Sequence, residues 1–275
     1  MKLIYKNLGE TPLEALEKLR QNEPALKEET LSYIGRLDPM AEGEILVLVG
    51  KTENQKRDEY LNFDKEYLAE FLVGFKTDTG DLLGVVQKTL TANNKDETFQ
   101  KNLTEKIATL PEKLSKITEQ KFPWFSSKHV LGRALFDWFK AGQQKEIERP
   151  SKQIKIYNAE LIRDTDETFS RKITTDELQN YLTENINKVK GNFRQSEILE
   201  KWQGILQSKK TVTTNSPVAN FPTAEFPVSE FPIFTLKLKV STGTYIRGLT
   251  EEIEKELGQP VVLFSLKRSK ICLDH

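Results

Sequence analysis

The apolar run ILVLV at positions 45–49 restricts the fold more than any other stretch of the chain. It is short, continuous and closed by Gly50, which is typical of a strand buried on both faces. Two more strands follow from alternation. The segment KEYLAEFLVGF at 65–75 places every second residue from Tyr67 on one face, and FTLKLKV at 234–240 alternates apolar and polar residues. These segments predict a sheet at the centre of the fold.

Helices are predicted between the strands. Thr11 as N-cap, Pro12 at the first helical position and Glu14 as capping-box partner predict a helix that ends before Pro24. The segment GRALFDWFKAG at 132–142 predicts a second helix. A third, at 241–258, has four apolar residues on one face, namely Ile246, Leu249, Ile253 and Leu257. With a further strand expected around Ile154 and Ile156, we predict an α+β, or mixed α/β, fold whose central, mostly antiparallel sheet is flanked by helices and loops.

Residues from about 163 to 230 differ from the rest of the chain. They contain two amphipathic helices, the first with a capping box from Thr174 to Glu177. Phe-Pro pairs at 221, 226 and 231 then predict an extended connector. We interpret this segment as an insertion in one domain that spans 1–275, and we favour a variable surface elaboration over a dedicated peptide-binding motif.

Composition excludes several classes of function. Lys plus Arg and Asp plus Glu both number 41, so any nucleic-acid contact must come from a local patch. One cysteine, Cys272, and two distant histidines, His129 and His275, argue against a disulfide, a zinc site and a Ser-His-Asp triad. No signal peptide or membrane-spanning run is recognisable. We therefore expect a reduced, soluble, cytoplasmic protein that works without cysteine or metal chemistry.

Three acidic residues and one arginine are candidates for chemistry. The DTG triplet at 78–80 resembles an aspartic-protease signature, but that chemistry needs two copies, and a turn explains TDTGD better. Asp78 with Asp81 could bind a divalent ion, for which one short loop is weak support. Pro39 holds Asp38 in extended geometry, and spacing alone favours a structural turn there. Arg247 lies where a helix begins, so it is either an ordinary surface arginine or the partner of a carboxylate or phosphate.

Five ordered segments resemble one family, the TruB-type tRNA pseudouridine synthases. They are GRLDPMAEG, KEYLAEFLVGFKTDTGDLLG, PWFSSKHVLGRALF, GTYIR and LKRS, within roughly 1–160 and 232–271. The resemblance implies a pseudouridine synthase fold. It also implies isomerisation of a uridine in the T loop of tRNA, at position 55, by base flipping and attack of an aspartate, without a cofactor or a metal.

The resemblance assigns roles to named residues. Asp38 would be the nucleophile, Arg247 would keep it ionised, and Tyr67 would stack on the flipped base and assist proton removal. The remaining substrate-binding residues are the pocket walls Tyr245 and Leu266, Lys6 beneath the catalytic loop or on RNA, and the RNA contacts Arg36, Lys128 and Arg268. The partner would be the T stem-loop of tRNA, bound by a monomer.

Departures from the family pattern concern RNA recognition. Tyr33 stands where the family usually has a His that fills the space left by the flipped nucleotide. The chain ends soon after LKRSK, so we expect no C-terminal PUA-like domain, and the insertion, with Lys188, Lys190, Arg194 and Lys201, would add RNA or subunit contacts. The alternative function is a catalytically inactive tRNA-binding or tRNA-folding module. An acid hydrolase that pairs Asp38 with Asp78 or Asp81 is a third hypothesis.

Overall fold

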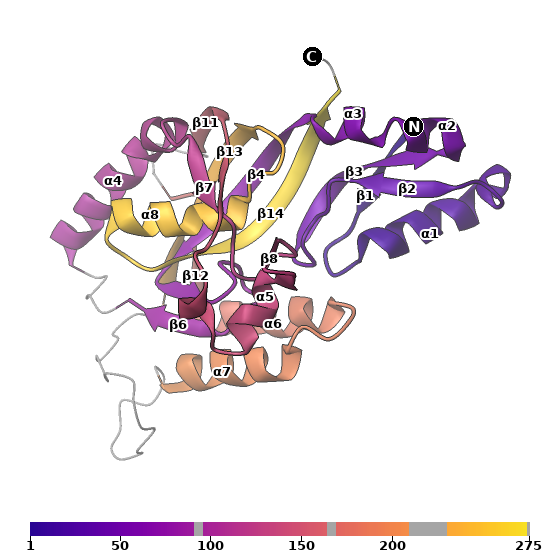
Figure 1. Ribbon diagram of the computed structural model, residues 1–275. Coiled ribbons are helices and arrows are strands. Elements are labelled where there is room, and N and C mark those ends of the chain that lie inside the picture. The colour runs from indigo at the N-terminus through magenta and orange to yellow at the C-terminus, as the bar shows by residue number, and fades with distance from the viewer. Residues whose placement is uncertain (91–95, 164–168, 209–229, 274–275) are drawn as a thin grey trace.

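An eight-stranded sheet forms the centre of the computed structural model, which describes residues 1–90, 96–163, 169–208 and 230–273. Its order is β1-β3-β14-β4-β13-β11, with β2 paired to β3 and β12 paired to β13 (Figure 1). Within this sheet only β14 and β3 pair in parallel. The predicted fold class, mixed α/β around a mostly antiparallel sheet, is therefore confirmed.

The strands are β1 (Lys2–Lys6), β2 (Leu31–Ile34), β3 (Ala41–Val49), β4 (Asp64–Val73), β5 (Phe75–Thr77), β6 (Val86–Thr89), β7 (Glu119–Lys121), β8 (His129–Val130), β9 (Arg133–Ala134), β10 (Ser151–Gln153), β11 (Ile156–Ile162), β12 (Arg171–Thr174), β13 (Glu230–Val240) and β14 (Val261–Cys272). The helices are α1 (Pro12–Asn22), α2 (Gly50–Gln55), α3 (Arg57–Leu61), α4 (Glu97–Ser115), α5 (Leu135–Lys140), α6 (Thr175–Lys188), α7 (Gln195–Ser208) and α8 (Thr250–Leu257), and the 3-10 helices are η1 (Pro24–Leu26), η2 (Gln144–Glu146) and η3 (Ile246–Leu249).

Local sequence signals set most of these boundaries. Helix α1 begins at the predicted capping box, in which the Thr11 hydroxyl accepts from the Glu14 amide and the Glu14 carboxylate accepts from the Thr11 amide. The four apolar residues at 246–257 are all buried. Their segment is divided, however, because Arg247 lies in η3 and only the later part is α-helical. The strand expected around Ile154 is also divided, because β10 pairs with β7 while β11 joins the main sheet.

Helices cover both faces of the sheet (Figure 1). On one face, α4 and α8 contribute to a core that contains Tyr67, Phe71 and Leu266. On the other, α6 and α7 pack over Leu72, Phe231, Ile233 and Phe264. The continuous apolar character of the central strands reflects this burial on two sides.

The two insertion helices belong to the hydrophobic core. Trp202 of α7 is fully buried, its ring lies 4.9 Å from the Phe75 ring, and its indole N–H donates to the Gly84 carbonyl at 3.1 Å. The interpretation of the insertion as a surface elaboration is therefore wrong for its helices. The third Phe-Pro pair, at Phe231, is the buried start of β13. The pairs at 221 and 226 lie outside the described residues.

The helices in the described part of the chain include none that is long and apolar enough to span a membrane.

Candidate active site

Asp38 lies in the loop between β2 and β3, three residues before Ala41 begins the central strand. Its backbone carbonyl accepts from the Ala41 amide at 3.0 Å. The side chain is 40% exposed. Gly35, at the start of the loop, has a φ of 70°, a conformation that favours glycine. The loop thus presents a carboxylate at the edge of a buried strand, where solvent and a substrate can reach it.

Two buried cations hold this loop from beneath. Lys6 donates from Nζ to the Ala41 carbonyl at 2.6 Å and to the Asn7 carbonyl at 3.1 Å. Arg268 donates to the carbonyls of Gly35 at 2.9 Å and Glu44 at 2.6 Å. Both side chains are almost fully buried, and burial lowers the pKa of Lys6 to about 8. Lys6 thus contacts the backbone beneath the loop, which is the first of the two positions considered for it. The predicted RNA contact of Arg268 is wrong, because its guanidinium is used inside the protein.

Arg247 is the closest partner of Asp38. Its guanidinium, 5% exposed, donates from Nε to Oδ2 of Asp38 at 2.7 Å. Nη1 donates to the Thr79 carbonyl at 2.9 Å, and Nη2 donates to the Phe125 carbonyl at 2.6 Å. Burial acts to lower the pKa of Arg247, but the carboxylates of Asp38 and Asp81 outweigh it and raise that pKa. A permanent cation is therefore fixed against the exposed carboxylate, as the position of Arg247 in the sequence suggested.

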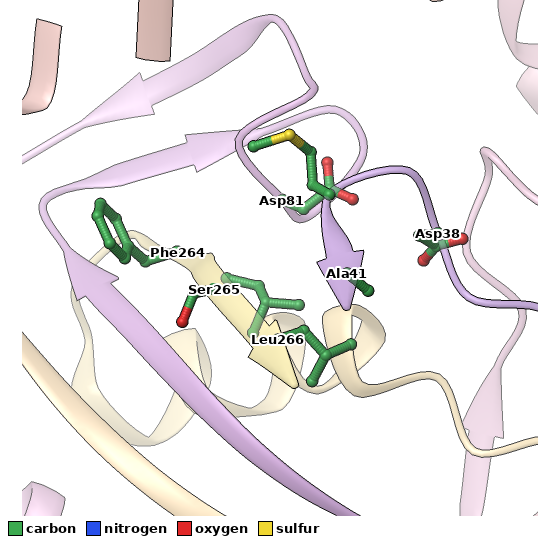
Figure 2. A pocket seen from close by; sticks show the side chains of 8 residues that line it. Asp38, Ala41, Asp81, Phe264, Ser265 and Leu266 are labelled. Carbon is green, nitrogen blue, oxygen red and sulfur yellow. The ribbon is translucent and has the colours of Figure 1, made fainter. Parts of the chain in front are cut away.

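Asp81 is a buried member of the same charge cluster. It accepts from the Thr79 hydroxyl at 2.7 Å and from the Leu83 amide at 3.0 Å. Burial raises the pKa of its carboxyl, against the opposing effect of Arg247. Figure 2 shows Asp38 and Asp81 on either side of the start of β3, with Leu266 of β14 beside Ala41. Asp81 is buried, with 8% of its surface exposed, whereas the Asp38 side chain is 40% exposed.

The TDTGD segment forms the predicted turn. The Asp78 carboxylate accepts from the Val85 amide at 2.9 Å. A Cβ at Gly80 would lie 2.6 Å from the Arg247 carbonyl, so the turn packs directly on the backbone of η3. Both aspartates of the turn are thus engaged by their own loop. This leaves the acid-hydrolase hypothesis without a second exposed carboxylate next to Asp38.

Two aromatic side chains, Tyr245 and Phe122, extend the contacts of Arg247. The Tyr245 ring lies 5.9 Å from Cζ of Arg247 and 5.8 Å from the Phe122 ring, and Nζ of Lys128 lies 5.3 Å above Phe122. Gln120 fixes Tyr245 by donating to its carbonyl and accepting from its amide, both at 2.9 Å. Burial raises the pKa of the Tyr245 phenol. Tyr67, buried on β4, belongs to the same apolar cluster as Leu266.

An open pocket of about 550 Å³ borders Asp38 and Arg247. Its walls include Leu83, Phe125 and Phe136. Ligand pockets in proteins have volumes of roughly 300–1,000 Å³, so this pocket has the size of a small-molecule or nucleotide site. The site therefore combines the exposed carboxylate of Asp38, the buried guanidinium of Arg247 and a pocket with apolar walls.

Comparisons with known proteins identify the family. Residues 24–182 match the family model described as "TruB family pseudouridylate synthase (N terminal domain)". The chain belongs to this family.

Curated members similar to this chain carry the name tRNA pseudouridine synthase B. The protein from Bacillus cereus is 33% identical over 163 residues, which are 59% of this chain and 49% of the relative. Those from Moorella thermoacetica and Streptococcus pneumoniae are 34% identical over 160 and 159 residues, covering 58% and 57% of this chain and 48% and 50% of the relatives. The chain spans about half the length of the curated relatives it matches.

A solved structure similar to this TruB-family chain is a Cbf5-Nop10-Gar1 complex, with a TM-score of 0.46 and 15% identity. The alignment covers 98% of this chain and 48% of that chain.

The structure also gives the exposure and the neighbours of the other predicted residues of this TruB-family chain. Arg36 and Lys128 are exposed, and the charge of Arg36 acts on the titration of Tyr245. Tyr33 lies half-buried on β2 opposite Val47. The structure thus brings Asp38, Arg247, Tyr245 and Leu266 together.

Sequence reasoning missed three parts of the site. They are the charge of Asp81, the clamp by Gln120, and a pocket wall formed by Asn192, Phe193 and Arg194. The two aspartates within TDTGD could have indicated the buried charge of Asp81. The other two depend on contacts between segments far apart in the chain, which no local pattern reveals.

Proposed function

We propose that this chain isomerises uridine to pseudouridine in the T loop of tRNA, with Asp38 as the nucleophile. The observation that carries the proposal is the 2.7 Å contact between the buried Arg247 guanidinium and the exposed Asp38 carboxylate. The buried guanidinium pairs with the charge of the carboxylate that would attack and holds that carboxylate in place. Family membership and the names of the relatives support RNA as the substrate.

The reaction rearranges atoms within one nucleotide. The N1–C1′ bond of uridine breaks, the base rotates, and a C5–C1′ bond forms, while C5 loses a proton and N1 gains one. No net oxidation or reduction occurs. Asp38 would attack an electrophilic carbon of the base or of the ribose, Tyr67 would stack on the extruded base and assist removal of the C5 proton, and Leu266 with Tyr245 would exclude water.

Binding of the RNA would rely on a few exposed cations. Arg36 and Lys128 are exposed near Tyr245 and Phe122, in keeping with a neutral chain that concentrates positive charge locally. The hairpin would be recognised by shape, with the target base unstacked. We propose that the chain acts as a cytoplasmic monomer, with residues 163–230 inserted into one catalytic domain.

The proposal is tested by mapping the product. An unmodified tRNA transcript is incubated with the protein, and pseudouridine is located by primer extension after carbodiimide treatment. We expect one stop, at the T-loop uridine, and none in a control transcript with cytidine there. Stops only outside the T loop would contradict the assigned substrate. Tight binding without any stop would instead support the inactive tRNA-binding module.

A further inference from the structure

The connector between α6 and α7, residues 189–194, forms one wall of the pocket that contains Asp38. Asn192, Phe193 and Arg194 line that pocket together with Asp38 and Arg247. The match to the family model ends at residue 182, so this wall lies beyond the part of the chain that the family pattern describes. The insertion therefore reaches the candidate active site.

On one side, Gly9 links the connector to the Asp38 loop. The Lys190 amide donates to the Gly9 carbonyl at 3.3 Å, and the Gly9 amide donates to the Pro39 carbonyl at 2.9 Å. Gly9 has a φ of 82°, and a Cβ there would lie 2.7 Å from Cβ of Lys188. The end of α6 thus packs closely on the segment that supports the residue following Asp38.

On its other side the connector is attached to the TDTGD turn. Nη1 of Arg194 donates to Oδ2 of Asp78 at 2.9 Å, and the Asp78 side chain is only 2% exposed. Cζ of Arg194 lies 4.6 Å from the Phe125 ring. The carbonyl of Phe125 accepts from Arg247. Arg194 therefore joins the connector to two of the segments that position Arg247.

Contacts within the connector fix the position of Phe193. Gln195 donates from Nε2 to the carbonyls of Gly191 at 2.6 Å and Val189 at 3.1 Å, and its Oε1 accepts from the Phe193 amide at 2.9 Å. Phe193 is nevertheless 41% exposed. The backbone of Phe193 is thus fixed, and its ring remains accessible in the pocket that contains Asp38, where it is available for stacking.

We propose that Phe193 stacks on a second unpaired base of the RNA substrate, next to the base that reaches Asp38, and that Arg194 is the positioning residue that holds Phe193. The inference rests on the proposed function for the identity of the substrate. The target uracil would lie against Leu266 and Tyr67, and Phe193 lines the open pocket that Asp38 and Arg247 border. Two cations, Arg194 and Lys140, line the same pocket as Phe193, and basic groups combined with exposed aromatic rings are typical of sites that bind single-stranded RNA.

Binding is measured first, so that the result does not depend on turnover. A fluorescently labelled T-stem-loop RNA is titrated with the Asp38→Asn protein and with the same protein carrying Phe193→Ala, Phe193→Trp or Tyr157→Ala. Tyr157, on β11, is a matched control because its ring is aromatic and its exposure, 44%, is close to the 41% of Phe193. Thermal unfolding confirms that each variant is folded. We expect Phe193→Ala to weaken binding by roughly tenfold or more, Phe193→Trp to restore it to within about twofold, and Tyr157→Ala to leave it unchanged.

Steady-state kinetics of variants that keep Asp38 then distinguish contact with a second base from contact with the target base. Phe193→Ala should raise KM and leave kcat unchanged, whereas a fall in kcat at unchanged KM would mean contact with the reacting base and would overturn the proposal. Arg194→Ala should weaken RNA binding as much as Phe193→Ala does. The double variant should bind RNA no more weakly than either single variant. Arg194→Lys should bind more tightly than Arg194→Ala and so recover part of the lost affinity.

The two proposals fail in different ways. Unchanged binding and KM in Phe193→Ala, alongside normal pseudouridine formation, would refute the stacking role and leave the proposed function intact. Weakened binding in Phe193→Ala, with no product from the unsubstituted protein, would refute the proposed function and support the stacking role.

Discussion

Replacing Arg247 with methionine tests how the site keeps a carboxylate charged. Arg247 donates to Asp38, to Thr79 and to Phe125 from a buried position. Breaking a buried ion pair costs about 3–5 kcal/mol. Asp38 is 40% exposed and can be rehydrated, which places the expected loss at the lower end of that range. We predict that Arg247→Met lowers the free energy of unfolding by about 3 kcal/mol at neutral pH.

The free energy of unfolding that Arg247→Met loses should depend on pH, because the Asp81 carboxyl titrates. Burial already raises the pKa of this carboxyl in the folded protein, and Arg247 opposes that effect. Without Arg247 the folded-state pKa rises further. An acid with a raised folded-state pKa reduces stability above its unfolded-state pKa, and the penalty disappears as pH falls. The deficit of Arg247→Met should therefore be larger at pH 8 than at pH 5.

Urea-induced unfolding at both pH values measures the effect. Lys255→Met is the matched control, because Lys255 pairs with Glu252 at 2.8 Å on the surface and is 68% exposed. Such surface pairs contribute roughly 0–1 kcal/mol. Arg247→Lys should recover only part of the loss, because an ammonium cannot reproduce the planar fork of three donors. A deficit in Arg247→Met no larger than that of the control, or equal deficits at pH 5 and pH 8, would refute the reasoning.

Two further predictions concern the supports of the site. Burial lowers the pKa of Lys6 from 10.5 to about 8. Its charged form therefore destabilises the folded protein below pH 8, and this penalty decreases as pH rises toward 10.5. Relative to Lys6→Met, the wild-type free energy of unfolding should increase by roughly 2 kcal/mol between pH 8 and 9.5, and a constant difference in urea unfolding would contradict the assignment. Trp202 is fully buried against Phe75, so Trp202→Ala should lower the free energy of unfolding by about 3–5 kcal/mol; a loss below about 1 kcal/mol would mean that the insertion does not stabilise the core.

The fold could be predicted largely because its signals are local. Strand alternation, the capping box at Thr11 and the apolar spacing from Ile246 each depend on neighbouring residues, and the structure retains all three. The position of Arg247 near the start of a helix left a surface arginine and the partner of a carboxylate or phosphate as alternatives, and its pairing with Asp38 was predicted from the resemblance to the family.

The parts that were missed depend on tertiary contacts. Arg268 has the appearance of a surface cation in the sequence, yet β14 pairs with β3 and brings its side chain beneath the Asp38 loop. The backbone of Arg268 approaches Gly43 so closely that a Cβ there would meet its carbonyl oxygen. The amphipathic pattern of the insertion predicted two helices. It could not reveal which face of the sheet they cover or that Phe193 reaches the pocket.

The central claim is that Asp38 is the nucleophile. A tRNA transcript carrying tritium at C5 of its uridines releases that tritium when C5 bonds to C1′, so single-turnover release measures the reaction directly. The account predicts release by the wild-type protein and none above background by Asp38→Asn, which should still bind the transcript. Release by Asp38→Asn at a rate close to that of the wild-type protein would contradict it.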